Sequence, residues 1–199
     1  TLDSKSLCLD WDRLKDTNPD TVAWIYAPDT EIDYPIMHAP DKPYDYYLKR
    51  NIYGKYQNSG TPFIDIRNSG LLTDFCTIVY GHQVKDGSMF SDMLKFEEQD
   101  YYENHKSFYM MTPDKSFRID IFACIYIRAD DDMIYSKTFN LGDEYRRYDY
   151  LSYVKANSLI NTDVNPSIYD RIIAFSTYQP KGKYEKNDRN TVFCTVSNI

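Results

Sequence analysis

Short apolar segments rich in β-branched and aromatic residues recur along the chain, and turn-forming residues separate them. Most of these segments are about four to eight residues long, which is typical of strands rather than helices. The expected strands are 32–37, 63–66, 76–80, 108–111, 117–127, 171–177 and 190–196. So many short strands favour a mostly β barrel over a doubly wound parallel sheet.

Helical patterns are few, and they lie at the start of the chain or between the expected strands. A period close to 3.6 residues predicts helices over 4–15, 88–96 and 143–160. In Thr17–Asp20, a side chain that can cap a helix precedes a proline and an acidic residue. This pattern predicts a second N-terminal helix that leads into Ile25.

Length and charge limit the class of protein. The 199 residues are enough for one domain with a full hydrophobic core. We expect a single domain over 1–199, with a helical N-terminal part at 1–26 and the barrel at 27–199. The net charge of −7 argues against a nucleic-acid partner, which needs a basic face. No stretch approaches about 18 consecutive apolar residues, so we expect no transmembrane helix.

The cysteines and acidic residues do not form a metal-binding pattern. Cys8, Cys76, Cys124 and Cys194 are widely spaced, and the three histidines are dispersed, so no zinc-binding spacing is present. We expect buried thiols, no metal ion and no cofactor. A disulfide that joins Cys124 to Cys76 or to Cys194 stays open as an alternative. The acidic run at 130–132 lacks the ligand spacing of a calcium loop and is expected to be solvated.

Tyrosine is frequent, with 20 residues in the chain. Five tyrosines lie close together, at Tyr44, Tyr46, Tyr47, Tyr53 and Tyr56. Such a cluster commonly packs loops onto a barrel, and the alternative is that it lines a groove for a peptide.

Two polar residues stand where a rigid strand meets a loop. His82 follows the apolar strand 76–80, so a fixed element would position its ring within reach of solvent. Arg189 begins the last strand, eleven residues after Tyr178, and could donate to a substrate carbonyl or to an oxyanion. The alternatives are an ordinary structural histidine and a loop arginine paired with Asp188 or Glu185.

Several motifs in combination resemble class B sortases. Thr77–His82 followed by Lys85–Phe90 resembles the catalytic-histidine segment of that family. Other segments resemble further parts of the family over nearly the whole chain: 18–25, 32–36, 46–48, 59–65, Arg67-Asn68, 109–114 and the helix at 143–160. The resemblance implies an eight-stranded sortase-like barrel with N-terminal helices and a helix inserted before the penultimate strand.

The resemblance also implies a chemistry. In sortases a Cys attacks a Thr carbonyl in a sorting signal, and an amine on peptidoglycan or on a pilin resolves the thioacyl intermediate. Carried over to this chain, His82 is the acid/base partner, Arg189 orients the carbonyl, and Ser176 and Thr177 contact the substrate. The resemblance further implies the surface of a Gram-positive cell and an N-terminal membrane anchor that is absent from this chain.

One departure from the family pattern concerns the nucleophile. The family strand reads Leu-Ser-Thr-Cys, whereas Phe175–Tyr178 reads Phe-Ser-Thr-Tyr, so Tyr178 stands at the cysteine position. A thiol has a pKa of about 8.5 and a phenol of about 10, so the ionised fraction at neutral pH is roughly thirty-fold smaller for the phenol. Three interpretations of Tyr178 stay open: it inactivates the site by filling it, it binds a peptide or glycan, or it acts as a catalytic phenol.

Three hypotheses follow for the function. The first is a sortase B-like protein with weak or no transpeptidation. The second is a non-catalytic module that binds sorting-signal peptides, pilins or a partner sortase. The third is a hydrolase that uses Ser176 or Tyr178. All three predict that Tyr178 lies within side-chain reach of His82 and Arg189.

Overall fold

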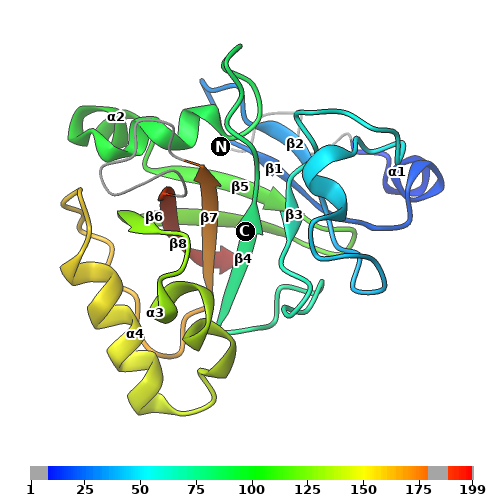
Figure 1. Cartoon of the computed structure of the whole chain (residues 1–199). Coiled ribbons are helices and arrows are strands. Elements are labelled where there is room, and N and C mark those ends of the chain that lie inside the picture. The colour runs from blue at the N-terminus through cyan, green and yellow to red at the C-terminus, as the bar shows by residue number, and fades with distance from the viewer. Residues whose placement is uncertain (1–8, 179–187, 199) are drawn as a thin grey trace.

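Eight strands close into a barrel in the order β1-β2-β3-β4-β7-β8-β6-β5 (Figure 1). The computed structural model describes residues 9–178 and 188–198. The strands are β1 Thr21–Tyr26, β2 Asp33–Met37, β3 Phe63–Ile64, β4 Cys76–Tyr80, β5 Ser107–Met111, β6 Ser116–Arg128, β7 Ile172–Tyr178 and β8 Asp188–Asn198. The predicted eight-stranded, mostly β barrel is confirmed.

Short helices decorate the barrel. The α-helices are α1 Trp11–Thr17, α2 Gln99–Asn104, α3 Asp132–Tyr135 and α4 Glu144–Ala156, and the 3-10 helices are η1 Tyr46–Lys49, η2 Ser91–Glu97 and η3 Lys137–Asn140. Helix α4 lies between β6 and β7, where the inserted helix was expected, and Figure 1 shows it against the outside of the barrel. The helix predicted at 88–96 begins later, at Ser91, because Met89 takes a positive φ of 58° and the chain first folds back on His82.

The predicted second N-terminal helix is wrong, because strand β1 occupies that position. Alternate residues of β1 are buried, and the strand pairs with both β2 and β5. Asn18, which could cap a helix, instead ends α1, and its side-chain amide donates to the Tyr47 hydroxyl at 2.9 Å and to the Ile52 carbonyl at 2.8 Å. Strand pairing and these tertiary hydrogen bonds therefore outweigh the local helix signal.

The parallel pairing of β4 with β7 arranges one rim of the barrel. Cys76 through Tyr80 pair in register with Ile172 through Ser176. Strand β8 runs antiparallel to β7, so Tyr178 at the end of β7 lies opposite Arg189 near the start of β8. Because parallel strands end at the same edge, the loop after β4, the end of β7 and the start of β8 meet at this rim.

Strands β4 and β7 are buried on both faces, which explains their continuous apolar runs. One face lies in the barrel interior, where Phe175 packs edge-on against Phe90 and Phe108. The other face packs with the inner side of α4.

Among the described cysteines, three are buried free thiols, namely Cys76, Cys124 and Cys194, so neither disulfide is formed. Cys8 lies outside the described residues. Over residues 9–178 and 188–198, no helix is long and apolar enough to cross a membrane.

The aromatic interior gives a test of the core. Phe108 is fully buried, and its ring centroid lies 5.4 Å from that of Phe96 and 6.0 Å from that of Phe175. Phe108→Ala should lower the free energy of unfolding by about 3–5 kcal/mol, because it removes this packing and leaves a cavity. Urea unfolding followed by fluorescence measures the change. Tyr145→Ala is the matched control, since Tyr145 is 86% exposed, and it should change stability by less than about 0.5 kcal/mol. Equal losses in the two variants would contradict this description of the core.

Candidate active site

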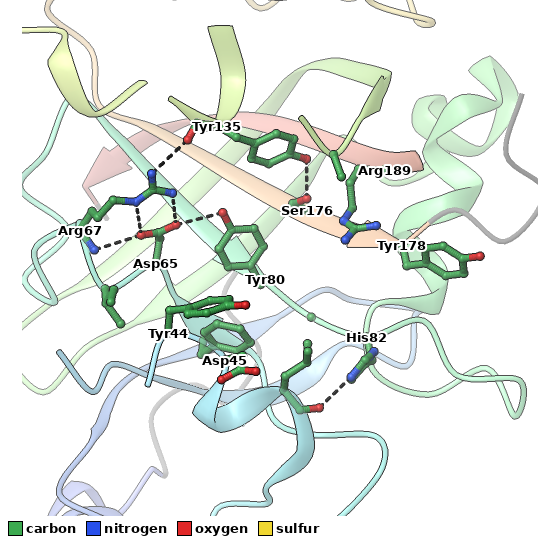
Figure 2. Close-up of a pocket in the computed structure, with 15 residues that line it drawn as sticks. Tyr44, Asp45, Asp65, Arg67, Tyr80, His82, Tyr135, Ser176, Tyr178 and Arg189 are labelled. Carbon is green, nitrogen blue, oxygen red and sulfur yellow. Dashed lines mark hydrogen bonds and ion pairs between the residues drawn. The ribbon is translucent and has the colours of Figure 1, made fainter. Parts of the chain in front are cut away.

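A cavity of about 720 Å³ opens at the rim where β4 and β7 end (Figure 2). His82, Ser176, Tyr178 and Arg189 line it, so the structure brings together four of the five residues named from the sequence. Residues of η1, of the β3 end and of α3 complete its walls. Thr177 is buried on the other face of β7, outside this lining.

Strand β4 and the glycine after it place His82. The Gly81 amide donates to the Ser176 carbonyl at 3.2 Å and so continues the β4–β7 pairing by one residue. A Cβ on Gly81 would lie 2.4 Å from the buried ring of Phe90, so only glycine lets the chain pass here. The His82 Nε2 atom lies 2.7 Å from the Leu48 carbonyl oxygen. Because a carbonyl only accepts, Nε2 carries the hydrogen and leaves Nδ1 as the acceptor of the neutral ring.

The charge state of His82 follows from its surroundings. Burial lowers its pKa, and the positive charges of Lys49 and Arg189 act in the same direction. The hydrogen bond to Leu48 opposes them without reversing the result, so the pKa lies below the ordinary value for histidine. The ring is therefore mostly neutral at neutral pH.

Tyr178 and Arg189 form a pair across the β7–β8 ladder. The guanidinium carbon of Arg189 lies 5.8 Å from the centroid of the Tyr178 ring, so the prediction that Tyr178 is within reach of Arg189 is confirmed. His82 lines the same cavity, and its reach to Tyr178 stays a prediction. Arg189 also donates to the Asp188 carbonyl at 3.2 Å. The Tyr178 side chain is 37% exposed, and Figure 2 shows its hydroxyl pointing away from both Arg189 and His82. This orientation directs the phenol away from His82, the candidate general base, and does not suit a catalytic phenol.

Ser176 lines the cavity, but its hydroxyl forms a hydrogen bond with Tyr135 rather than with His82. Its Oγ lies 2.8 Å from the Tyr135 hydroxyl, which also lies 3.2 Å from Thr191 Oγ1. Among the hydrogen bonds of the described residues, none joins Ser176 to His82. A nucleophilic serine needs a base within hydrogen-bond reach, so this geometry does not activate Ser176.

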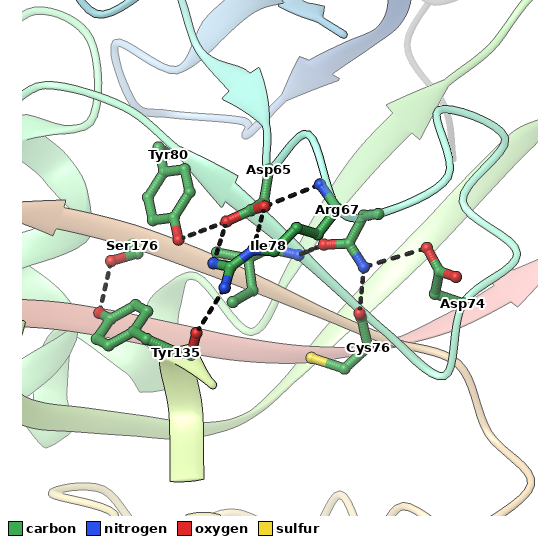
Figure 3. Close-up of polar contacts among 9 residues, drawn as sticks. Asp65, Arg67, Asp74, Cys76, Ile78, Tyr80, Tyr135 and Ser176 are labelled. Carbon is green, nitrogen blue, oxygen red and sulfur yellow. Dashed lines mark hydrogen bonds and ion pairs between the residues drawn. The ribbon is translucent and has the colours of Figure 1, made fainter. Parts of the chain in front are cut away.

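A polar network at the far end of the cavity was not expected from the sequence (Figure 3). The Asp65 carboxylate accepts from Arg67 at 2.8 Å and from the Tyr80 hydroxyl at 3.0 Å, and Arg67 reaches the Tyr135 carbonyl at 3.2 Å. Burial alone would raise the pKa of Asp65, but the hydrogen bonds and charge of Arg67 outweigh it, so this pKa is below its usual range. The Asp-x-Arg spacing after a strand was visible, but its link to Tyr135 was not.

The tyrosines of the cluster have different surroundings, and a role in a peptide groove stays a prediction. Tyr44 is 73% exposed and lines the cavity, whereas Tyr47 is buried and bonded to Asn18. The acidic run at 130–132 forms the start of a helix rather than a loop alone: Asp130 lies in a turn, Asp131 caps α3 and Asp132 begins that helix. In the part of the chain that the structure describes, no group of three His, Cys, Asp or Glu residues could hold a metal ion.

The neutral state of His82 can be measured. In an NMR titration followed at the ring Cε1–H, His82 should titrate below the midpoint of about 6.5 of an exposed histidine, because burial and two cations disfavour its charged form. Lys49→Ala should move the midpoint upward, since it removes one of those charges. The third histidine, His105, stacks on Tyr101 outside the cavity lining and serves as the internal control for the Lys49 variant. A His82 midpoint at or above 6.5 would contradict the described environment.

Comparisons with known proteins agree with this geometry. No family model matches the chain. The chain is 37% identical to Sortase B of Listeria monocytogenes over 173 residues, which is 87% of this chain and 68% of that protein. It is 29% identical to Sortase B of Staphylococcus aureus over 167 residues, or 84% of this chain and 66% of that protein.

Solved structures are similar over almost the whole chain. A Staphylococcus aureus sortase B–substrate complex matches with a TM-score of 0.85 and 26% identity, over 94% of this chain and 84% of that one. Clostridium perfringens sortase B matches with a TM-score of 0.84 and 27% identity, over 94% and 100%. A sortase B complexed with triglycine matches with a TM-score of 0.82 and 26% identity, over 95% and 86%. With the shared barrel, the cavity at the β4–β7 rim and this level of identity, the chain belongs to the sortase B family.

Proposed function

We propose that this chain is a sortase B-like protein that binds sorting-signal peptides but carries out transpeptidation weakly or not at all. The observation that carries the proposal is Tyr178 at the end of β7, opposite Arg189 and on the same cavity as His82. This is where the resemblance puts the nucleophilic cysteine. A phenol ionises less at neutral pH than a thiol and is the weaker nucleophile toward an amide.

The remaining two residues suit the family reaction. The guanidinium of Arg189 can donate to the carbonyl of the substrate threonine and favour charge on its oxygen. His82, whose Nδ1 is left as an acceptor, can take a proton from an incoming group and return it to a leaving amine. In family chemistry these groups serve a thiolate, and the acceptor is a peptidoglycan or pilin amine. Without a thiol at position 178, Arg189 can still orient the carbonyl, but no thiolate is present to attack it.

A non-catalytic function is the second candidate, and the open cavity favours it. Its volume of about 720 Å³ lies within the range of ordinary ligand pockets, and the outward-pointing Tyr178 hydroxyl leaves room beside His82. A relative solved as a substrate complex and another solved with triglycine support a peptide and an amine as partners. The chain would then hold a sorting signal, a pilin or a partner sortase without cleaving it.

The proposed location follows from the family. We place the protein at the outer face of the membrane or in the cell wall of a Gram-positive bacterium, held by an N-terminal anchor outside the given sequence. The relatives from Listeria monocytogenes and Staphylococcus aureus support this assignment.

Substitution at position 178 tests the proposal. Wild type should not cleave quenched fluorescent peptides of the N-P-x-T-x type, because it lacks a thiol at this position. Tyr178→Cys should gain thiol reactivity and cleavage, and the double variant Tyr178→Cys with His82→Ala should lose the cleavage. Tyr145→Cys is the matched control, since it puts a thiol on an exposed site outside the cavity lining. Cleavage rates and labelling by a thiol reagent are the measurements.

Binding of the same peptides to wild type, followed by fluorescence anisotropy against a scrambled peptide, separates the two candidates. Binding without cleavage supports the non-catalytic function. Cleavage by wild type that is lost in His82→Ala would show a nucleophile other than cysteine and refute the proposal. If wild type does not bind these peptides and Tyr178→Cys does not cleave them, the cavity no longer takes sorting signals.

A further inference from the structure

One wall of the cavity is a short segment inserted between β6 and β7. Residues 132–140, which contain α3 and η3 and which we call the α3–η3 wall, carry Tyr135 into the cavity lining. On its outer side the wall is fastened through Asp131, which caps α3 and accepts from the Tyr153 hydroxyl of α4 at 2.6 Å. Thr138 Oγ1 also donates to the Tyr150 hydroxyl of α4 at 3.2 Å. The contacts on the cavity side hold the part of the wall that carries Tyr135.

The guanidinium of Arg67 provides that second attachment. Its Nε and Nη2 atoms donate to the Asp65 carboxylate at 2.9 and 2.8 Å, and its Nη1 donates to the Tyr135 carbonyl at 3.2 Å (Figure 3). Its carbon lies 3.7 Å from the centroid of the Phe139 ring. One planar group thus joins the end of β3 to both short helices of the wall, α3 through Tyr135 and η3 through Phe139.

The β3 side of this attachment is rigid. Asp65 is buried, and it also accepts from the Arg67 amide and from the Tyr80 hydroxyl of β4. Asn68 in the same loop bonds the backbone of β4 twice, to the Cys76 carbonyl and from the Ile78 amide, each at 2.9 Å. Because the loop is fixed to a central strand, the end of this attachment at Asp65 stays in place. A change in the contact between Arg67 and Tyr135 therefore requires the wall to move.

The position of the wall reaches the proposed binding site through Tyr135. Its hydroxyl lies 2.8 Å from Ser176 Oγ, and Ser176 shares a strand face with Tyr178, two residues later. A peptide that runs along the cavity toward Tyr178 therefore passes the Tyr135–Ser176 pair.

We infer that Arg67 is a positioning residue that clamps the α3–η3 wall, so that Tyr135 and Ser176 present a fixed surface to a bound peptide. The inference rests on the proposed function, because it assumes that the cavity takes a peptide. Arginine is suited to this task, since its planar fork bonds Asp65 and Tyr135 while its face stacks on Phe139. A lysine ammonium keeps the charge but cannot make all three contacts.

A matched pair of substitutions tests the clamp. Arg67→Gln should speed hydrogen–deuterium exchange of the amides in 132–140 about tenfold and weaken binding of an N-P-x-T-x peptide about tenfold, because charge-assisted bonds are lost. Arg118→Gln is the control. Arg118 is also half exposed and also pairs with an aspartate two residues away, Asp120 at 2.8 Å, but on strand β6 outside the cavity lining. It should change neither quantity.

Two further variants separate geometry from stability. Arg67→Lys keeps the charge and should still lose most of the protection in 132–140, whereas Phe139→Leu removes only the stacked ring and should lose part of it. Unfolding temperatures are measured for every variant, and the exchange result counts where the rest of the barrel keeps its protection. Exchange in 132–140 that stays at the wild-type rate in both Arg67 variants would overturn the clamp.

The outcomes also separate this inference from the proposed function. Faster exchange in the wall with unchanged peptide binding would overturn the positioning of the peptide and leave the proposed function intact. Failure of wild type to bind any sorting-signal peptide would refute the proposed function and with it the peptide part of the inference. The exchange measurement, which needs no peptide, would still decide the clamp.

Discussion

The parallel pairing of β4 with β7 is the constraint on which the rest of this structure depends. Five consecutive residue pairs fix the two strands in register, and parallel strands end at one rim. Strand β8 is bonded antiparallel to β7, so it has to start where β7 ends. His82, Tyr178 and Arg189 follow β4, end β7 and lie near the start of β8, and these two pairings together bring them to one cavity. The 3-10 helix η1 then closes on His82 through the Leu48 carbonyl, which orients the ring without a second ionisable group.

The rim also explains why the barrel tolerates tyrosine at position 178. The residues of β7 that precede it are all buried, and a larger side chain among them would have to displace its neighbours in a close-packed interior. Tyr178 is the exposed end of the strand, and its ring turns outward beside Arg189. The fold therefore accommodates a large side chain at position 178, whereas Gly81, whose missing Cβ lets Phe90 pack, is fixed by sterics.

Much of the barrel could be predicted from the sequence, and the parts that could not share a cause. Strands 76–80 and 171–177 were evident because burial on both faces leaves an unbroken apolar run. The helix predicted after Thr17–Asp20 failed because Asn18 bonds to residues about thirty positions away, and a local pattern cannot report such partners. The connection of Arg67 to Tyr135 was out of reach for the same reason, and because its acceptor is a main-chain carbonyl that leaves no mark in the sequence.

The two ends of the cavity depend on different parts of the fold. The end with His82 and Arg189 is set by the β4–β7–β8 rim, which also places Tyr178, the residue on which our proposal of weak or absent catalysis rests. The other end is set by Arg67, which ties the α3–η3 wall to β3 through contacts that do not include position 178. A change of the side chain at position 178 therefore leaves the contacts of the α3–η3 wall in place. Because the surface that would recognise a peptide and the atom that would attack it are held by separate interactions, a chain of this family can change one and retain the other.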